Sequence, residues 1–348
     1  TQVFRRVALP LASPAIAIGT ALALMEVLND IGASEFLGVQ TMTVAVYTTW
    51  VTRSDLPGAA QIALAMLAIV IALLALERHA RRRQRYAAVE RPRPMRPKRL
   101  RGGAALLALA LGVFPVLVGF VLPAGYLAWE AVERIGQHGV SPQLLASVGN
   151  TVGVALAATL VTLAAGLVLG WSMRLAQGRR RPAGALLALR GGSLGYAVPG
   201  TVLAIGLLLP LAWFDDGANA LLAGFGMTPR MLLMGSATAL VLAYAVRFLA
   251  IAAGGVESGL ARVPPSLDQA AASLGHAPGS TLWRIHLPLL RPALAAAALL
   301  VFVDAMKELP ATLLLRPLNF ETLATWLYAE ASRGTYEEGA VAALLIVL

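Results

Sequence analysis

The stretch "GAAQIALAMLAIVIALLAL" (residues 58–76) decides the fold, because it runs for 19 residues without a charged side chain. An α-helix rises 1.5 Å per residue, so about 20 apolar residues are needed to cross the hydrocarbon core of a bilayer. A membrane-spanning β-strand would instead alternate apolar and polar residues, and this stretch does not. It therefore predicts a transmembrane helix.

The composition extends this prediction to the whole chain. Apolar residues make up 58% of its 348 residues and charged residues only 13%, whereas soluble domains contain about 25% charged residues. Eight apolar stretches are long enough to be candidate spans, the last of them ending with the chain: 12–30, 58–77, 104–124, 147–173, 194–213, 231–253, 291–309 and 338–348. We expect an all-α, polytopic membrane protein.

The net charge of +10 has a distribution that indicates topology. If residue 1 is cytoplasmic, 22 of the 28 Lys and Arg residues fall on the cytoplasmic side, which is the side that positive loops prefer. The charge therefore argues against a nucleic-acid partner. The basic, Pro-rich segment 78–103 is interpreted as a cytoplasmic linker that touches anionic membrane lipid.

The residue types exclude several kinds of chemistry. The chain has no Cys, and its four His residues are far apart in sequence, so no metal site is assigned and no catalytic residue is expected. No Gly-x4-Gly-Lys-Ser/Thr loop is present, and Lys98 and Lys307 are the only lysines. We expect a protein that is not an enzyme, binds no cofactor and takes energy from a partner.

The two ends of the chain resemble each other. The stretch "FRRVALPLASPA" (4–15) aligns with "LWRIHLPLLRPA" (282–293) at an offset of 278 residues. Both copies start on the same side of the membrane, which is typical of parallel repeats. We expect residues 1–77 to be the last two helices of a truncated first half, 78–103 the linker, and 104–348 a six-helix second half whose last helix is cut short.

A short polar stretch separates two of the predicted spans. "SLDQAAASLG" (266–275) predicts a helix that Ser266 caps, Asp268 stabilises through the helix dipole, and Gly275 ends. This stretch is either an ordinary loop or a surface helix that a soluble partner binds.

This stretch carries a family resemblance. Gln269-Ala270-Ala271, Gly275, Ile285, Leu287 and Pro288 resemble the signature loop Glu-Ala-Ala-x3-Gly-x9-Ile-x-Leu-Pro of ABC importer permeases, with Gln269 where the family usually has Glu. Leu9 and Pro10 resemble the end of the same loop in a first half. The stretches 195–210, 242–251 and 303–317 look like the fused two-half permeases for ferric iron. Thiamine, phosphonate, polyamine and sulfate systems share this architecture.

The resemblance implies a type I ABC importer permease in the bacterial inner membrane. The loop would form a coupling helix that docks on a cytoplasmic ABC ATPase dimer, and that partner would use ATP and Mg. A periplasmic binding protein would deliver the substrate, with ferric iron as the first expectation. A secondary carrier or a membrane-embedded enzyme is the alternative class.

Charged residues inside the predicted spans are candidates for the translocation path. The repeat aligns Glu26 with Asp304 and Asp30 with Glu308, beside Lys307. These five residues either line the path of a cation or are polar helix ends, with Lys307 paired to Asp304 or Glu308.

Three other features have local interpretations. Pro199 and Gly200 fall inside a predicted helix and indicate a gate or a packing kink. Arg247 is placed near the inner end of its helix, as an anchor at the membrane surface or the coupling loop. The pairs Gly149/Gly153 and Gly166/Gly170 predict close helix packing.

Overall fold

The computed structural model describes residues 2, 4–82, 100–176 and 195–347, and the regular structure in these ranges is entirely helical. Six of its helical segments are long and apolar enough to cross a membrane. They are Leu56–Leu76, Gly103–His138, Pro142–Leu175, Gly200–Ala223, Ala237–Ala261 and Pro278–Met306. The all-α, polytopic prediction is confirmed.

The two ends of the chain fold into similar series of elements: a π-helical turn, a long helix, a short helix, a further helical segment and a last helix. The first series is η1 (Phe4–Ala8), α1 (Leu9–Asn29), α2 (Gly32–Phe36), α3 (Met42–Tyr47), η2 (Thr48–Thr52) and α4 (Leu56–Arg82). The second is α12 (Pro278–Thr281), η4 (Leu282–His286), α13 (Leu287–Met306), α14 (Pro310–Leu315), α15 (Leu323–Arg333) and α16 (Tyr336–Val347).

Local details of the two series also agree. The π-helical turns η1 and η4 each lead directly into a long helix. Thr41 and Thr322 each cap a short helix by accepting a hydrogen bond from the backbone N–H three residues ahead, at 3.4 and 3.3 Å. The parallel repeat predicted from the sequence is therefore present in the structure.

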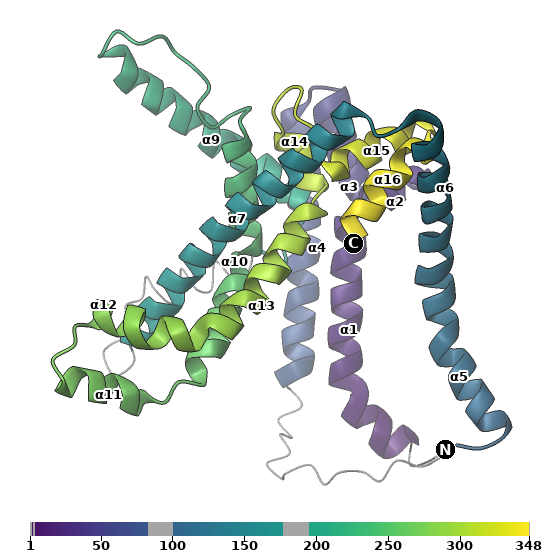
Figure 1. Cartoon of the computed structure of the whole chain (residues 1–348), viewed down its shortest axis with the longest axis horizontal. Helices are drawn as coiled ribbons and strands as arrows, with labels where there is room; N and C mark the ends of the chain where they lie inside the picture. Colours follow the sequence, from purple (N-terminus) through teal and green to yellow (C-terminus); the bar gives the residue numbers. More distant parts are fainter. Residues whose placement is uncertain (1, 3, 83–99, 177–194, 348) are drawn as a thin grey trace.

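The middle of the chain supplies the remaining long helices. These are α5 (Gly103–Val116), η3 (Leu117–Val121), α6 (Leu122–His138), α7 (Pro142–Leu175), α9 (Gly200–Ala223), α10 (Ala237–Ala261) and the short α11 (Pro265–Ser273). The helices α7, α10 and α13 pack together, whereas α5 and α6 stand apart and contact the body through α16 (Figure 1).

Small residues bring α7 and α10 close together. A Cβ added at Gly166 would lie 2.9 Å from the Ala252 side chain, and one at Gly170 would lie 2.5 Å from Val256. Gly149 and Gly153 have no such neighbour within 4 Å. The packing prediction is thus confirmed for the second glycine pair and wrong for the first.

Several helix boundaries differ from the predicted ones. Helix α9 continues to Ala223, and α10 begins only at Ala237. The intervening chain is held by Asp215, whose carboxylate accepts hydrogen bonds from the backbone N–H groups of Leu233 and Met234, both at 2.9 Å. Helix α16 begins at Tyr336, two residues before the predicted start.

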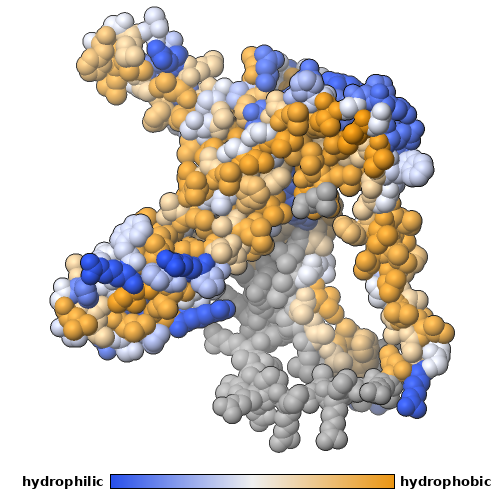
Figure 2. All heavy atoms as spheres, in the orientation of Figure 1, coloured by the Kyte–Doolittle hydropathy of each residue, from blue (hydrophilic) through white to orange (hydrophobic). Residues whose placement is uncertain are grey.

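The molecule has two polar ends. Figure 1 places α11, α12 and the N-terminus at one end, and α2, α3, α14 and α15 at the other. Exposed apolar side chains cover the long helices between these ends, and polar residues gather on the α11–α12 tip and on the opposite end (Figure 2). The positive-inside distribution assigns the α11–α12 end to the cytoplasm.

Candidate functional site: a charged cavity and a cytoplasmic tip

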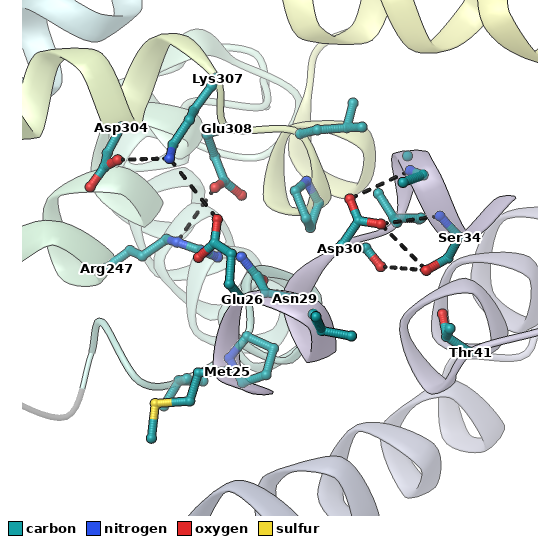
Figure 3. Close-up of a pocket in the computed structure, with 18 of the residues that line it drawn as sticks. Met25, Glu26, Asn29, Asp30, Ser34, Thr41, Arg247, Asp304, Lys307 and Glu308 are labelled. Carbon is teal, nitrogen blue, oxygen red and sulfur yellow. Dashed lines mark hydrogen bonds and ion pairs between the residues drawn. The ribbon is translucent and has the colours of Figure 1, made fainter. Parts of the chain in front are cut away.

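A cavity of about 1000 Å³ lies where the two repeats and the middle helices meet. Its walls come from the end of α1, the short helix α2, the turn that precedes α9, the middle of α10 and the end of α13 (Figure 3). Its charged lining residues include all five predicted path residues together with one further cation: Glu26, Asp30, Arg247, Asp304, Lys307 and Glu308.

Lys307 joins the two repeats within this cavity. Its Nζ lies 3.2 Å from Asp304 Oδ1 and 4.0 Å from Glu26 Oε1, so these carboxylates converge on one ammonium group (Figure 3). The predicted Lys307–Asp304 pair is present. The structure thus brings together the two residues that the repeat alignment made equivalent.

Asp30 and Glu308 are equivalent in their hydrogen bonds as well as in the alignment. Asp30 accepts from the backbone N–H of Ser34 at 3.1 Å and of Ala33 at 3.5 Å. Glu308 accepts from the backbone N–H of Ala311 at 2.9 Å. Each carboxylate therefore satisfies amide groups at the start of the short helix that follows a long one.

Arg247 is a cavity residue, which the sequence reasoning missed. Because α10 continues to Ala261, Arg247 lies in the middle of the helix, and its predicted place at the inner end is wrong. It is 6% exposed, and its Nε lies 3.4 Å from Oε2 of the buried Glu308. Arg247 Nε and Nη1 are buried without a hydrogen-bond partner in the described part of the chain. Glu308 thus pairs with Arg247 and not with Lys307.

Pro199 and Gly200 begin a helix and do not interrupt one. Residues 195–198 form a turn and a bend, Pro199 precedes α9, and Gly200 is its first residue. The Gly200 backbone N–H donates to Asn29 Oδ1 at 2.9 Å. A Cβ at Gly200 would overlap Arg247 Nη1 and lie 2.7 Å from Glu308 Oε1. The prediction of a kink is therefore wrong, and this glycine makes room for the ion pair.

The predicted coupling stretch forms α11, at the opposite end of the molecule from the short helices α14 and α15. Pro264 precedes the helix, and no side chain caps it, so the predicted cap by Ser266 is wrong. Gly275 has a φ of +77°, a left-handed conformation that glycine adopts without strain. Its predicted role in ending the helix is confirmed.

A buried clamp fixes α11 to the membrane helices. Arg174 at the end of α7 donates through Nε to Asp268 Oδ2 at 2.9 Å, and through Nη1 and Nη2 to the carbonyls of Leu260 and Val263. The other Asp268 oxygen lies 2.5 Å from Nε2 of the fully buried His286. Asp268 was expected only to stabilise the helix dipole, and its main contacts are these two side chains.

The tip presents a mixed surface to solvent. Gln269, Ala270, Gly275 and Pro288 are exposed, Ile285 and Leu287 are half-buried, and Ala271 is buried. Leu274 and Trp283, next to this motif, are 77% and 68% exposed. Leu9 and Pro10 begin α1 and occupy the same position relative to η1 as Leu287 and Pro288 do to η4.

The family of the chain follows from comparison with known proteins. The family described as "Binding-protein-dependent transport system inner membrane component" matches residues 1–86 and 175–348. The chain belongs to this family of multi-pass inner-membrane permeases.

Two relatives that the chain resembles are named as permeases of transport systems. The chain is 26% identical over 351 residues to the Fe(3+)-transport system permease protein FbpB 2 of Haemophilus influenzae, covering 97% of this chain and 64% of that protein. It is 34% identical over 92 residues to the putative 2-aminoethylphosphonate transport system permease protein PhnV of Salmonella typhimurium, which is 26% of this chain and 35% of that one. The chain thus spans less than two thirds of the length of either protein.

A solved structure shares the fold. A chain of a bacterial alginate ABC transporter, in complex with an alginate pentasaccharide-bound periplasmic protein, superposes with a TM-score of 0.54 at 15% sequence identity. The superposition covers 69% of this chain and 88% of that one. At this identity the likeness concerns the fold alone.

Proposed function

We propose that this chain forms the membrane pathway of an ATP-driven importer, and that ferric iron passes through the charged cavity. A periplasmic binding protein delivers the substrate, and an ABC ATPase dimer with bound ATP and Mg supplies the energy at the cytoplasmic end. The similarity to a ferric permease along nearly the whole chain supports the substrate.

The single observation that carries this proposal is the charge of the cavity. Its described lining holds four carboxylates and two cationic side chains, an excess of negative charge that attracts cations. Carboxylates within a membrane protein are costly unless they face water or partners, and they mark ion pathways. In this cavity Glu26, Asp304 and Glu308 have cationic partners and Asp30 accepts backbone hydrogen bonds, which supports such a role.

The α11–α12 tip supports the coupling half of the proposal. The clamp of Arg174, Asp268 and His286 joins α11 to α7 and to η4, which leads directly into α13. Because the end of α13 lines the cavity, a movement of the tip would be transmitted to the cavity through α13. Leu274 and Trp283 expose apolar area beside Gln269 and Ala270, and such area at a polar end suits a protein partner.

Phosphonate is the second candidate substrate, because one relative carries that name over a local match. In addition, Arg247 beside the cavity has N–H groups that make no hydrogen bond within the described residues. The experiment is uptake of radiolabelled ferric iron and of 2-aminoethylphosphonate into proteoliposomes. These contain the full-length permease with its ATPase and binding protein. We expect iron to accumulate and the phosphonate not to. Accumulation of the phosphonate alone would overturn the assignment to iron.

A further inference from the structure

Two tyrosines occupy equivalent positions of the repeat and face each other. Tyr47 ends α3 and Tyr328 lies in α15, each six residues after the capping threonine of its helix, Thr41 or Thr322. Their ring centroids are 6.0 Å apart, and the rings are nearly perpendicular at 82°. The short helices that carry them lie at the end of the molecule opposite α11 (Figure 1), which is the extracytoplasmic end.

A carboxylate completes this cluster. The Tyr328 hydroxyl donates a short hydrogen bond to Glu35 Oε2, and Glu35 comes from α2. Glu35 and Tyr328 line a second cavity of about 840 Å³. Tyr47, Tyr328 and Glu35 are all half-buried.

Glu35 has no cationic partner among the described residues. The neighbouring cations are each paired with another carboxylate: Lys307 with Asp304 at 3.2 Å, Arg333 with Glu330 at 2.9 Å, and Arg316 with Glu321. A partly buried carboxylate bonded only to a phenol is open to an incoming cation.

The donor set is entirely oxygen. Hard cations prefer anionic oxygen ligands, and tyrosine is an established ligand of ferric iron in haem proteins. Burial, followed by the hydrogen bond to Glu35, raises the pKa of Tyr328, and burial raises that of Tyr47. A tyrosine phenol is ordinarily protonated near neutral pH, so two phenolic protons pass to solvent when a trivalent cation takes their place.

This cluster adjoins the charged cavity. Gly32, Ala33, Lys307 and Leu309 line both cavities, so an ion released by the phenols has a short way to Asp304 and Glu26. We propose that Tyr47, Tyr328 and Glu35 form an extracytoplasmic receiving site for a trivalent cation, used before the cation enters the charged cavity. The inference rests on the proposed transport of iron.

The test is a titration of the purified full-length permease–ATPase complex, without binding protein, with ferric nitrilotriacetate. A phenolate–iron(III) bond gives a charge-transfer band in the visible region. We expect the wild type to show this band, and Tyr47→Phe and Tyr328→Phe to lose or strongly weaken it. Glu35→Gln should retain it with affinity lowered by about tenfold or more. Tyr126→Phe is the matched control, because Tyr126 is 57% exposed on α6 and should leave the band unchanged.

The outcomes separate this inference from the proposed function. If the wild type takes up iron with ATP but shows no band, or if the band persists in both tyrosine variants, the receiving site is wrong while the function stands. If the band appears and depends on both tyrosines but no iron enters proteoliposomes, the site stands and the transport proposal fails. Monodisperse elution of each variant shows that a lost band is not due to misfolding.

Discussion

Gly200 is the residue whose missing side chain leaves room for the charges of the cavity. It begins α9 directly against Arg247 and Glu308, and its backbone N–H reaches Asn29 at the end of α1. Removing one partner of a buried ion pair typically lowers the free energy of unfolding by about 3–5 kcal/mol. We therefore expect a displacement of the Arg247–Glu308 pair to lower both stability and transport.

Gly200→Ala should therefore destabilise the protein. The added Cβ would overlap the Arg247 guanidinium, and overpacking of this kind costs about 1–3 kcal/mol. Gly206→Ala on the same helix is the control, because nothing lies within 4 Å of its Cβ and alanine favours a helix by about 1 kcal/mol over glycine. Thermal unfolding of the purified protein should show a lower midpoint for Gly200→Ala only. Equal midpoints for the two variants would contradict the packing role of Gly200.

At this scale the sequence predicts residues that belong to a local pattern and misses those that meet through packing. Gly275 is predicted from the loop motif, and five of the charged residues that line the cavity are predicted from the repeat and the spans. The clamp was not predicted, because Arg174 and Asp268 are 94 residues apart and Asp268 was assigned only to the dipole of its own helix. The partner of Glu308 was missed because the position of Arg247 along its helix depends on where α10 ends.

At the scale of elements, α11 is ended by Gly275 and fixed in direction by the clamp of Arg174, Asp268 and His286. Gly275 reverses the chain with a φ of +77°, and its N–H bonds to the carbonyl of Ala272 at 3.0 Å. The clamp then fixes the helix direction. The tip keeps its shape without a hydrophobic core of its own, so its backbone geometry decides what surface a partner meets.

Gly275→Val should disturb the tip through the backbone alone. No atom lies within 4 Å of the added Cβ, whereas a side chain in the left-handed region costs roughly 1–3 kcal/mol. Gly279→Val tests the same change in α12, where the space is equally open and φ is not positive. We expect ATPase stimulation by loaded binding protein to fall for Gly275→Val and to persist for Gly279→Val, with normal membrane insertion of both. Full ATPase stimulation in both variants would contradict a role of Gly275 in coupling.

Long apolar helices could be predicted as elements, but several of their ends could not. The predicted span 194–213 stops short of the observed end of α9 at Ala223. Within that extension Asp215 is buried, and its carboxylate accepts hydrogen bonds from the backbone N–H groups of Leu233 and Met234. Likewise Glu308 satisfies the start of α14. These ends depend on single side-chain-to-backbone bonds and not on hydrophobicity.

At the scale of the whole molecule, the role given to each end depends on which side of the membrane that end faces. The α11–α12 tip is assigned to the cytoplasm and the cluster of α2, α3, α14 and α15 to the periplasm, from the distribution of Lys and Arg alone. The parallel repeat agrees, because both copies of the π-turn lead into helices that run from the cytoplasmic end.

Single cysteines can test this orientation, because the chain has no native Cys. Leu318, between α14 and α15, is 95% exposed, and Gly279 is exposed on the tip. In intact spheroplasts a membrane-impermeant maleimide should label Leu318→Cys and not Gly279→Cys. In inverted vesicles the pattern should reverse. Labelling of Gly279→Cys from outside would invert every side assignment.

The central claim is that a partner's ATP hydrolysis drives ferric iron through this chain, and the energy source tests it most directly. The measurement is iron uptake into proteoliposomes holding the full-length permease with its ATPase, with iron-loaded binding protein outside. The account predicts accumulation only with ATP and Mg at the ATPase face, and none with a non-hydrolysable analogue or with an imposed proton or sodium gradient. Accumulation driven by a gradient without ATP would contradict it and identify a secondary carrier.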